Sequence, residues 1–187
     1  MWEHRRWPWT FKSGGPGSGL HVTYDGGKTW KKIGLDATHH IARIVVDPKN
    51  PNIVFVAAQG SLYSSSNDRG IYKSIDGGTT WNNVTANITG LPKGAWIPQI
   101  RTSTYNANEV FVVANNYRQG DFAPYVFRTT DQGKTWTNIL SAAKVTGYAL
   151  SVIQDIVEPN LFFVGTEQGM YVSLDNAETF QQWKNGY

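Results

Sequence analysis

Apolar and polar residues alternate in short runs along most of the chain, and turn-forming residues separate these runs. Alternation over about four to eight residues is typical of β-strands, because successive side chains point to opposite faces of a sheet. No long run shows the spacing of a helix. The sequence therefore predicts an all-β protein. Strands are expected at residues 42–46, 53–58, 71–74, 80–84, 97–102, 110–114, 125–130, 135–140, 149–153, 161–165, 170–174 and 179–183.

One eight-residue pattern occurs four times, at residues 23–30, 74–81, 129–136 and 173–180. We call each copy an Asp turn. Its Asp can accept hydrogen bonds from backbone N–H groups of the same turn, and its Gly can take the positive φ of a tight hairpin. Each copy is therefore expected to close a hairpin and to place a large aromatic side chain at one fixed position. The defining residues are Asp25, Gly27 and Trp30, then Asp76, Gly78 and Trp81, then Asp131, Gly133 and Trp136, and finally Asp175 and Phe180.

The spacing of these turns predicts the architecture. Their aspartates are separated by 51, 55 and 44 residues, which is close to the period of four-stranded propeller blades. We expect a partial β-propeller of about four blades, with an incomplete unit at residues 1–34 and further units at 35–88, 89–141 and 142–187. So few blades leave apolar faces uncovered. The remaining blades of a longer parent chain, or a second copy, are expected to cover them.

The pattern Ser/Thr-x-Asp-x-Gly-x-Thr-Trp resembles the Asp-box, or bacterial neuraminidase repeat. This repeat occurs in sialidases, some glucan-cleaving glycosidases, photosystem assembly factors and sortilin-type receptors, all of which are β-propellers. Residues 2–11, 14–19, 39–48 and 163–173 are most similar to secreted bacterial proteins with a sortilin-type propeller, often labelled glycosyl hydrolases. The resemblance implies an exported parent, either extracellular or periplasmic. Because no signal peptide begins the chain, it is expected to be a piece of that parent.

Composition and charge narrow the function classes. With 187 residues, 40% hydrophobic content, 13% aromatic residues and 19 glycines, the chain suits one all-β domain with many turns. A net charge of +3 without a basic run does not favour nucleic-acid binding. No apolar stretch is long enough to span a bilayer. The absence of cysteine fits a bacterial relative, because eukaryotic sortilin-type receptors rely on disulfides.

The catalytic and metal-binding interpretations of the Asp turns are disfavoured, because four carboxylates spaced one per blade cannot converge on one substrate. A sialidase would need an arginine triad; Arg43, Arg101 and Arg128 exist, but the Arg-Ile-Pro signature is absent. A glucanase would need two carboxylates across a cleft. Asp121 and Glu167, in expected loops, are the least turn-like candidates. We predict no catalytic residue, cofactor or metal ligand; the adjacent His39 and His40 would point to opposite faces.

The segment with the most unusual composition contains Arg5, Arg6, Trp7 and Trp9. Aromatic faces and arginines could form a carbohydrate or peptide platform, but the alternation of Trp7 and Trp9 favours a buried strand. With Asp121 and Glu167, these four residues are the candidate ligand contacts. The favoured function is a non-catalytic scaffold that binds a peptide, protein or glycan. The alternative is a glycoside hydrolase, sialidase-like or xyloglucanase-like, or an inactive relative. Facing carboxylates would favour the enzyme, and an aromatic channel wall the binder.

Overall fold

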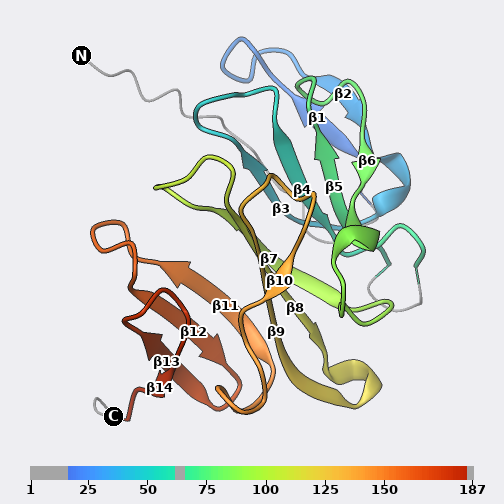
Figure 1. The fold of residues 1–187 in the computed structure, drawn as a ribbon. Helices are drawn as coiled ribbons and strands as arrows, with labels where there is room; N and C mark the ends of the chain where they lie inside the picture. Colours follow the sequence, from blue (N-terminus) through green and yellow to red (C-terminus); the bar gives the residue numbers. More distant parts are fainter. Residues whose placement is uncertain (1–16, 62–65, 185–187) are drawn as a thin grey trace.

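The computed structural model describes residues 17–61 and 66–184, and all of its sheets are antiparallel (Figure 1). The first sheet holds β1 (Leu20–Val22) and β2 (Lys31–Gly34). The second holds β3 (Ile41–Val46), β4 (Val54–Ala58), β5 (Gly70–Ser74) and β6 (Asn82–Asn83). The third holds β7 (Trp96–Thr102), β8 (Val110–Asn116), β9 (Asp121–Thr129) and β10 (Thr137–Asn138). The fourth holds β11 (Ala149–Gln154), β12 (Phe162–Thr166), β13 (Gly169–Ser173) and β14 (Gln181–Gln182). Short 3₁₀ helices are η1 (Asp36–Thr38), η2 (Thr85–Asn87) and η3 (Tyr117–Gln119).

Each four-stranded sheet is a meander in which consecutive strands pair, and neighbouring sheets pack face to face. The first strands of the sheets lie next to one another, β3 beside β7 and β7 beside β11. Figure 1 shows the third sheet between the other two four-stranded sheets. This arrangement is a partial β-propeller, so the predicted fold class is confirmed. The unit boundaries predicted from the spacing of the Asp turns stay a prediction.

The core lies between the sheets, and the alternation within β8 explains why. Val110 and Val112 belong to the core shared with the second sheet, whereas Phe111 and Val113 belong to the core shared with the fourth. Every residue of β8 is buried, because both faces of its sheet are covered. A separate core joins β1 and β2 to the outer face of β4, where Leu20 packs with Val54 and Val56. The sheets are thus held together by apolar side chains that alternate along their second strands.

Two groups of predicted strand boundaries are wrong. The fourth strands, expected at residues 80–84, 135–140 and 179–183, have two residues each, because the preceding Thr and aromatic residues belong to the Asp turns. In the third sheet, β9 begins at Asp121, which we had placed in a loop. The pairing between β8 and β9 reaches Asn116 opposite Asp121. Backbone and side-chain bonds to Asp121 hold this extension of the hairpin together.

Candidate functional site

The antiparallel meander sorts the connections onto two faces. The Asp turns, which join third strands to fourth, share the turn face with the connections from first strands to second. The loop face carries the connections from second strands to third and the links between sheets. On the loop face these connections include residues 117–120 and 167–168, and the links are residues 35–40, 84–95 and 139–148. A ligand site on one face is therefore built from loops of several sheets.

The Asp turns are closed by hydrogen bonds within each turn. In the second sheet, the Asp76 carboxylate accepts bonds from the Ser74 hydroxyl at 2.8 Å, the Thr80 N–H at 2.9 Å and the Thr80 hydroxyl at 2.6 Å. The Ser74 hydroxyl in turn accepts the Gly78 N–H at 2.8 Å. These bonds, led by that from Thr80, lower the pKa of Asp76 from 3.8 to about 2. A carboxylate held ionised in this way is a poor general acid.

The other three Asp turns repeat this geometry. Hydrogen bonds from Thr29 and Thr179 similarly lower the pKa values of Asp25 and Asp175 to about 2. Those from Thr135 lower the pKa of Asp131. The Gly position differs in the fourth turn, where Ala177 takes a φ of 69°. The described residues contain no group of three His, Asp or Glu side chains that could hold a metal ion.

In three of the four Asp turns, the aromatic residue packs toward the preceding sheet. The Trp81 indole donates to the Ile33 carbonyl at 2.7 Å. Trp136 joins the core that contains Phe55, and Phe180 packs against the core that contains Phe111. Trp30, for which no preceding sheet is described, stays 42% exposed. The aromatic positions therefore act in packing between sheets.

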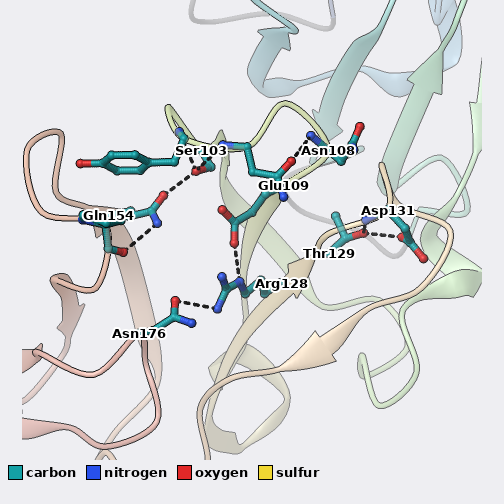
Figure 2. Close-up of polar contacts among 11 residues, drawn as sticks. Ser103, Asn108, Glu109, Arg128, Thr129, Asp131, Gln154 and Asn176 are labelled. Carbon is teal, nitrogen blue, oxygen red and sulfur yellow. Dashed lines mark hydrogen bonds and ion pairs between the residues drawn. The ribbon is translucent and has the colours of Figure 1, made fainter.

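Polar side chains join the third and fourth sheets on the turn face (Figure 2). Glu109 is 3% exposed, and its carboxylate pairs with the guanidinium of Arg128. The same guanidinium donates to the Asn176 amide oxygen at 3.0 Å. Nearby, the Ser103 hydroxyl donates to Gln154 at 2.7 Å. Arg128, one of the arginines considered for a sialidase triad, is thus bound within the protein.

A cavity of about 950 Å³ opens on the loop face between the second and third sheets. Among the residues that the structure describes, its wall includes three cationic side chains, Arg69, Lys93 and Arg118, and no carboxylate. Apolar residues, including Ile88 and Leu91, supply another part of the wall. The cavity is therefore basic and partly apolar, and its composition differs from the acidic cleft that a glycosidase requires.

Trp96 lies against two of these cations. The guanidinium carbons of Arg69 and Arg118 lie 4.2 Å and 4.0 Å from the centroid of its ring. Both guanidinium groups are therefore within cation–π distance of the indole. Arg69 also donates to the Gly94 carbonyl at 2.7 Å and to the Gln59 carbonyl at 2.7 Å. Burial, and then the charge of Arg118, lower the pKa of Arg69.

An aromatic shelf lies beside the cavity on the loop face, formed by Tyr117, Tyr148 and Phe122. The rings of Tyr117 and Tyr148 stack with centroids 4.7 Å apart, and Phe122 lies 6.2 Å from Tyr148. Phe122 is 55% exposed. The shelf combines residues of η3 and β9 with a residue from the link to the fourth sheet. It offers an exposed apolar surface next to the basic cavity.

The predicted ligand contacts differ in their surroundings. Asp121 accepts the Tyr125 hydroxyl at 2.9 Å and the Ala123 N–H at 3.1 Å. Burial acts to raise the pKa of Asp121, but hydrogen bonds from Ala123, Asn116 and Tyr125 outweigh it and lower the pKa. Glu167 is exposed on the loop face, and its N–H donates to the Tyr148 carbonyl at 3.3 Å. The remaining candidates, at positions 5, 6, 7 and 9, lie outside the described residues: Arg5, Arg6, Trp7 and Trp9.

Sequence reasoning missed the residues that build the cavity and the shelf. Arg69, Trp96 and Arg118 are far apart along the chain and belong to no shared motif. The Tyr117–Arg118 pair stood in an expected loop, which is where binding residues tend to occur. That position was the only signal that could have found them.

Comparison with known proteins places this fold among large propellers. No family model matches the chain. A distant homologue is the oligoxyloglucan-reducing end-specific xyloglucanase of Emericella nidulans, 27% identical over 175 residues; the match covers 87% of this chain and 19% of that protein. Among solved structures, the GH74 enzyme of Niastella koreensis superposes with a TM-score of 0.67 and 20% identity, over 88% of this chain and 26% of that one.

A smaller propeller is also similar. The YCF48 protein of Cyanidioschyzon merolae matches with a TM-score of 0.54 and 22% identity, over 82% of this chain and 39% of its own. A YCF48 structure with a bound D1 peptide matches with the same TM-score, 0.54. The chain thus spans about a fifth to two fifths of the length of these relatives. Its structural likeness to both kinds of propeller leaves open whether it binds or catalyses.

Proposed function

We propose that this chain supplies a non-catalytic binding surface, with the loop face as the site and a peptide or protein segment as the ligand. The observation that carries the proposal is the cavity of about 950 Å³, whose described wall residues include three cationic side chains and no carboxylate. Glycoside hydrolysis needs an acid and a base or nucleophile across a cleft. The side chains around this cavity offer neither, so binding without chemistry fits it better.

The cations against Trp96 argue for a peptide over a neutral glycan. Sugar rings bind proteins largely by stacking on open aromatic faces, and this indole is already in contact with two guanidinium groups. Backbone and polar groups of a peptide can instead bond to the edges of such a site. The solved complex of a YCF48 propeller with a D1 peptide supports the choice of ligand class. The sortilin-type resemblance of the sequence supports it too, and it extends the proposal to an extracellular or periplasmic location.

A glycosidase is the second candidate, favoured by the 27% identity to a fungal xyloglucanase. In this case Glu167 is the residue to test, because it is exposed on the loop face and is one of the two carboxylates predicted as ligand contacts. Asp121 is a weaker candidate, because its oxygens accept bonds from Asn116 and Tyr125. The chain covers 19% of that enzyme, so the activity of the whole enzyme does not transfer with the resemblance.

Both candidates can be tested on the same purified chain. We expect it to retain peptides from an arrayed peptide library, to leave xyloglucan oligosaccharides unbound on a glycan array, and to release no reducing sugar from xyloglucan. Release of reducing sugar that Glu167→Gln abolishes, and that the turn-face variant Glu178→Gln preserves, would overturn the binding proposal in favour of the enzyme. Failure to retain any peptide would also overturn it.

A further inference from the structure

The 3₁₀ helix η3 connects the cavity with the aromatic shelf. Its consecutive residues Tyr117 and Arg118 each contact a ring of another segment: Tyr117 stacks on Tyr148, and Arg118 stacks on Trp96. They also contact each other, because Arg118 donates to the Tyr117 hydroxyl at 3.2 Å. Tyr148 lies in the link that precedes the fourth sheet, whereas Trp96 begins the third sheet. The basic cavity and the apolar shelf are therefore adjacent, and one extended ligand can contact both.

The charge of the cavity selects the kind of group that enters it. The cationic groups of Arg69, Lys93 and Arg118 line the space, and no lining residue in the described ranges 17–61 and 66–184 carries a negative charge. The two guanidinium groups around Trp96 also repel each other, which is one cause of the lowered pKa of Arg69. An anion in the cavity would be attracted by all three cations and would reduce that repulsion. A cation in the cavity would be repelled by the same three groups.

The shelf favours a different kind of group. Phe122 exposes 55% of its surface beside the stacked rings of Tyr117 and Tyr148. No charged side chain is among the three shelf residues. An aromatic or aliphatic side chain laid on this surface buries apolar area on both partners and can pair with the rings edge to face.

We propose that the peptide bound at the loop face places a carboxylate in the basic cavity and an aromatic or aliphatic side chain on the aromatic shelf, on either side of η3. This inference rests on the proposed peptide-binding function and adds the chemistry of the ligand. It assigns the anionic subsite to Arg69, Lys93 and Arg118, and the apolar subsite to Tyr117, Phe122 and Tyr148.

The test uses the full chain and a peptide array in which each peptide is paired with a copy whose Asp and Glu are replaced by Asn and Gln. We expect the acidic member of a retained pair to bind roughly tenfold more tightly, since charge-assisted hydrogen bonds exceed neutral ones. Retention of no peptide would refute the proposed function itself. Retention of acidic and neutral members alike would leave that function standing and overturn this inference.

Single-residue variants then test whether the cavity cations bind the peptide carboxylate. For a retained acidic peptide, Arg118→Gln is expected to weaken binding about tenfold, and Arg118→Lys to restore part of the loss. Lys28→Gln removes the same charge from an exposed Asp-turn position and is expected to leave binding unchanged. Equal weakening by Arg118→Gln and Lys28→Gln would show a general attraction to a basic protein and would overturn the subsite assignment.

The shelf has a separate readout. In ¹H–¹⁵N NMR spectra of the full chain, the probe acetyl-Glu-Gly-Phe-amide, with homologues that have longer glycine spacers, is expected to shift the Trp96 indole signal and the Tyr148 and Phe122 amides. Replacing the probe's Phe by Ala should remove only the shelf shifts. Shelf signals that move equally with both probes would overturn the apolar subsite.

Discussion

Trp136 and Trp30 provide the sharpest test of how the sheets hold together, because they occupy the same position in two Asp turns. Each indole donates to the carbonyl of a turn glycine at 3.2 Å, Gly133 for Trp136 and Gly27 for Trp30. Their surroundings differ: Trp136 is 8% exposed in the core with Phe55, whereas Trp30 is 42% exposed. Truncation of both residues therefore compares packing between sheets at a constant turn geometry.

The structure sets the expected magnitude. The two exposures differ by about 34% of a Trp side chain of up to roughly 250 Å². At ~25 cal/mol per Å², these roughly 80 Å² correspond to about 2 kcal/mol. Truncation of a buried Trp to Ala costs about 3–5 kcal/mol in general. We expect Trp136→Ala to lower the free energy of unfolding by about 4 kcal/mol, and Trp30→Ala by about 2 kcal/mol.

Urea unfolding followed by far-UV circular dichroism measures both variants without depending on tryptophan fluorescence. If Trp136→Ala leaves no folded baseline, Trp136→Phe retains part of the apolar contact and keeps the comparison measurable, with an expected loss between those of Trp136→Ala and wild type. Equal losses for Trp136→Ala and Trp30→Ala would refute the reasoning, because they would show that the aromatic side chain stabilises its own turn and not the packing between sheets.

Three further predictions concern polar groups and backbone. The pKa of Asp76 is lowered from 3.8 to about 2, so its stabilisation is present above pH 3.8 and is lost as the pH falls towards 2. The urea concentration at the midpoint of unfolding should therefore decrease between pH 3.8 and pH 2, and the decrease should be smaller for Asp76→Asn. Glu109→Gln breaks the buried pair with Arg128 and should cost about 3 kcal/mol in urea unfolding; a loss below about 1 kcal/mol would contradict this. Gly70→Ala would place a Cβ 2.1 Å from the Thr85 hydroxyl at a φ of 152°, so its thermal midpoint should fall; an unchanged midpoint would show that the loop relaxes freely.

The Asp turns could be predicted because their interactions are local. The Asp25 carboxylate bonds to Thr23 and Thr29, no more than four positions away. Such bonds depend on residue types and spacing within one short segment, and the repeat of that segment indicates the period of the blades. The alternating runs also predicted most strands from local sequence, because successive side chains of a strand point to opposite faces of the sheet.

The ends of the strands were less predictable. The apolar pattern continued past β5 and β9 into expected fourth strands, but the first residues of those expected strands belong to the Asp turns and serve the turn or the neighbouring sheet. Trp81, for example, donates to the Ile33 carbonyl of β2, 48 positions earlier. In β9 the reverse happened, since bonds to Asp121 extended pairing into a stretch that looked like a loop.

By itself, the sequence determined the all-β class, the four Asp turns and the partial propeller, because each follows from contacts between residues close along the chain. Only the tertiary structure decided the candidate site. Arg69, Trp96 and Arg118 stand 27 and 22 positions apart, and they meet because packing of the second sheet on the third brings their loops to one face. The pairing of β8 with β9 brings Arg128 to Glu109. Packing of the second sheet on the third buries Trp136, while Trp30 stays exposed. Similar local sequence thus has different surroundings, since the neighbours of a side chain in a propeller belong to another blade.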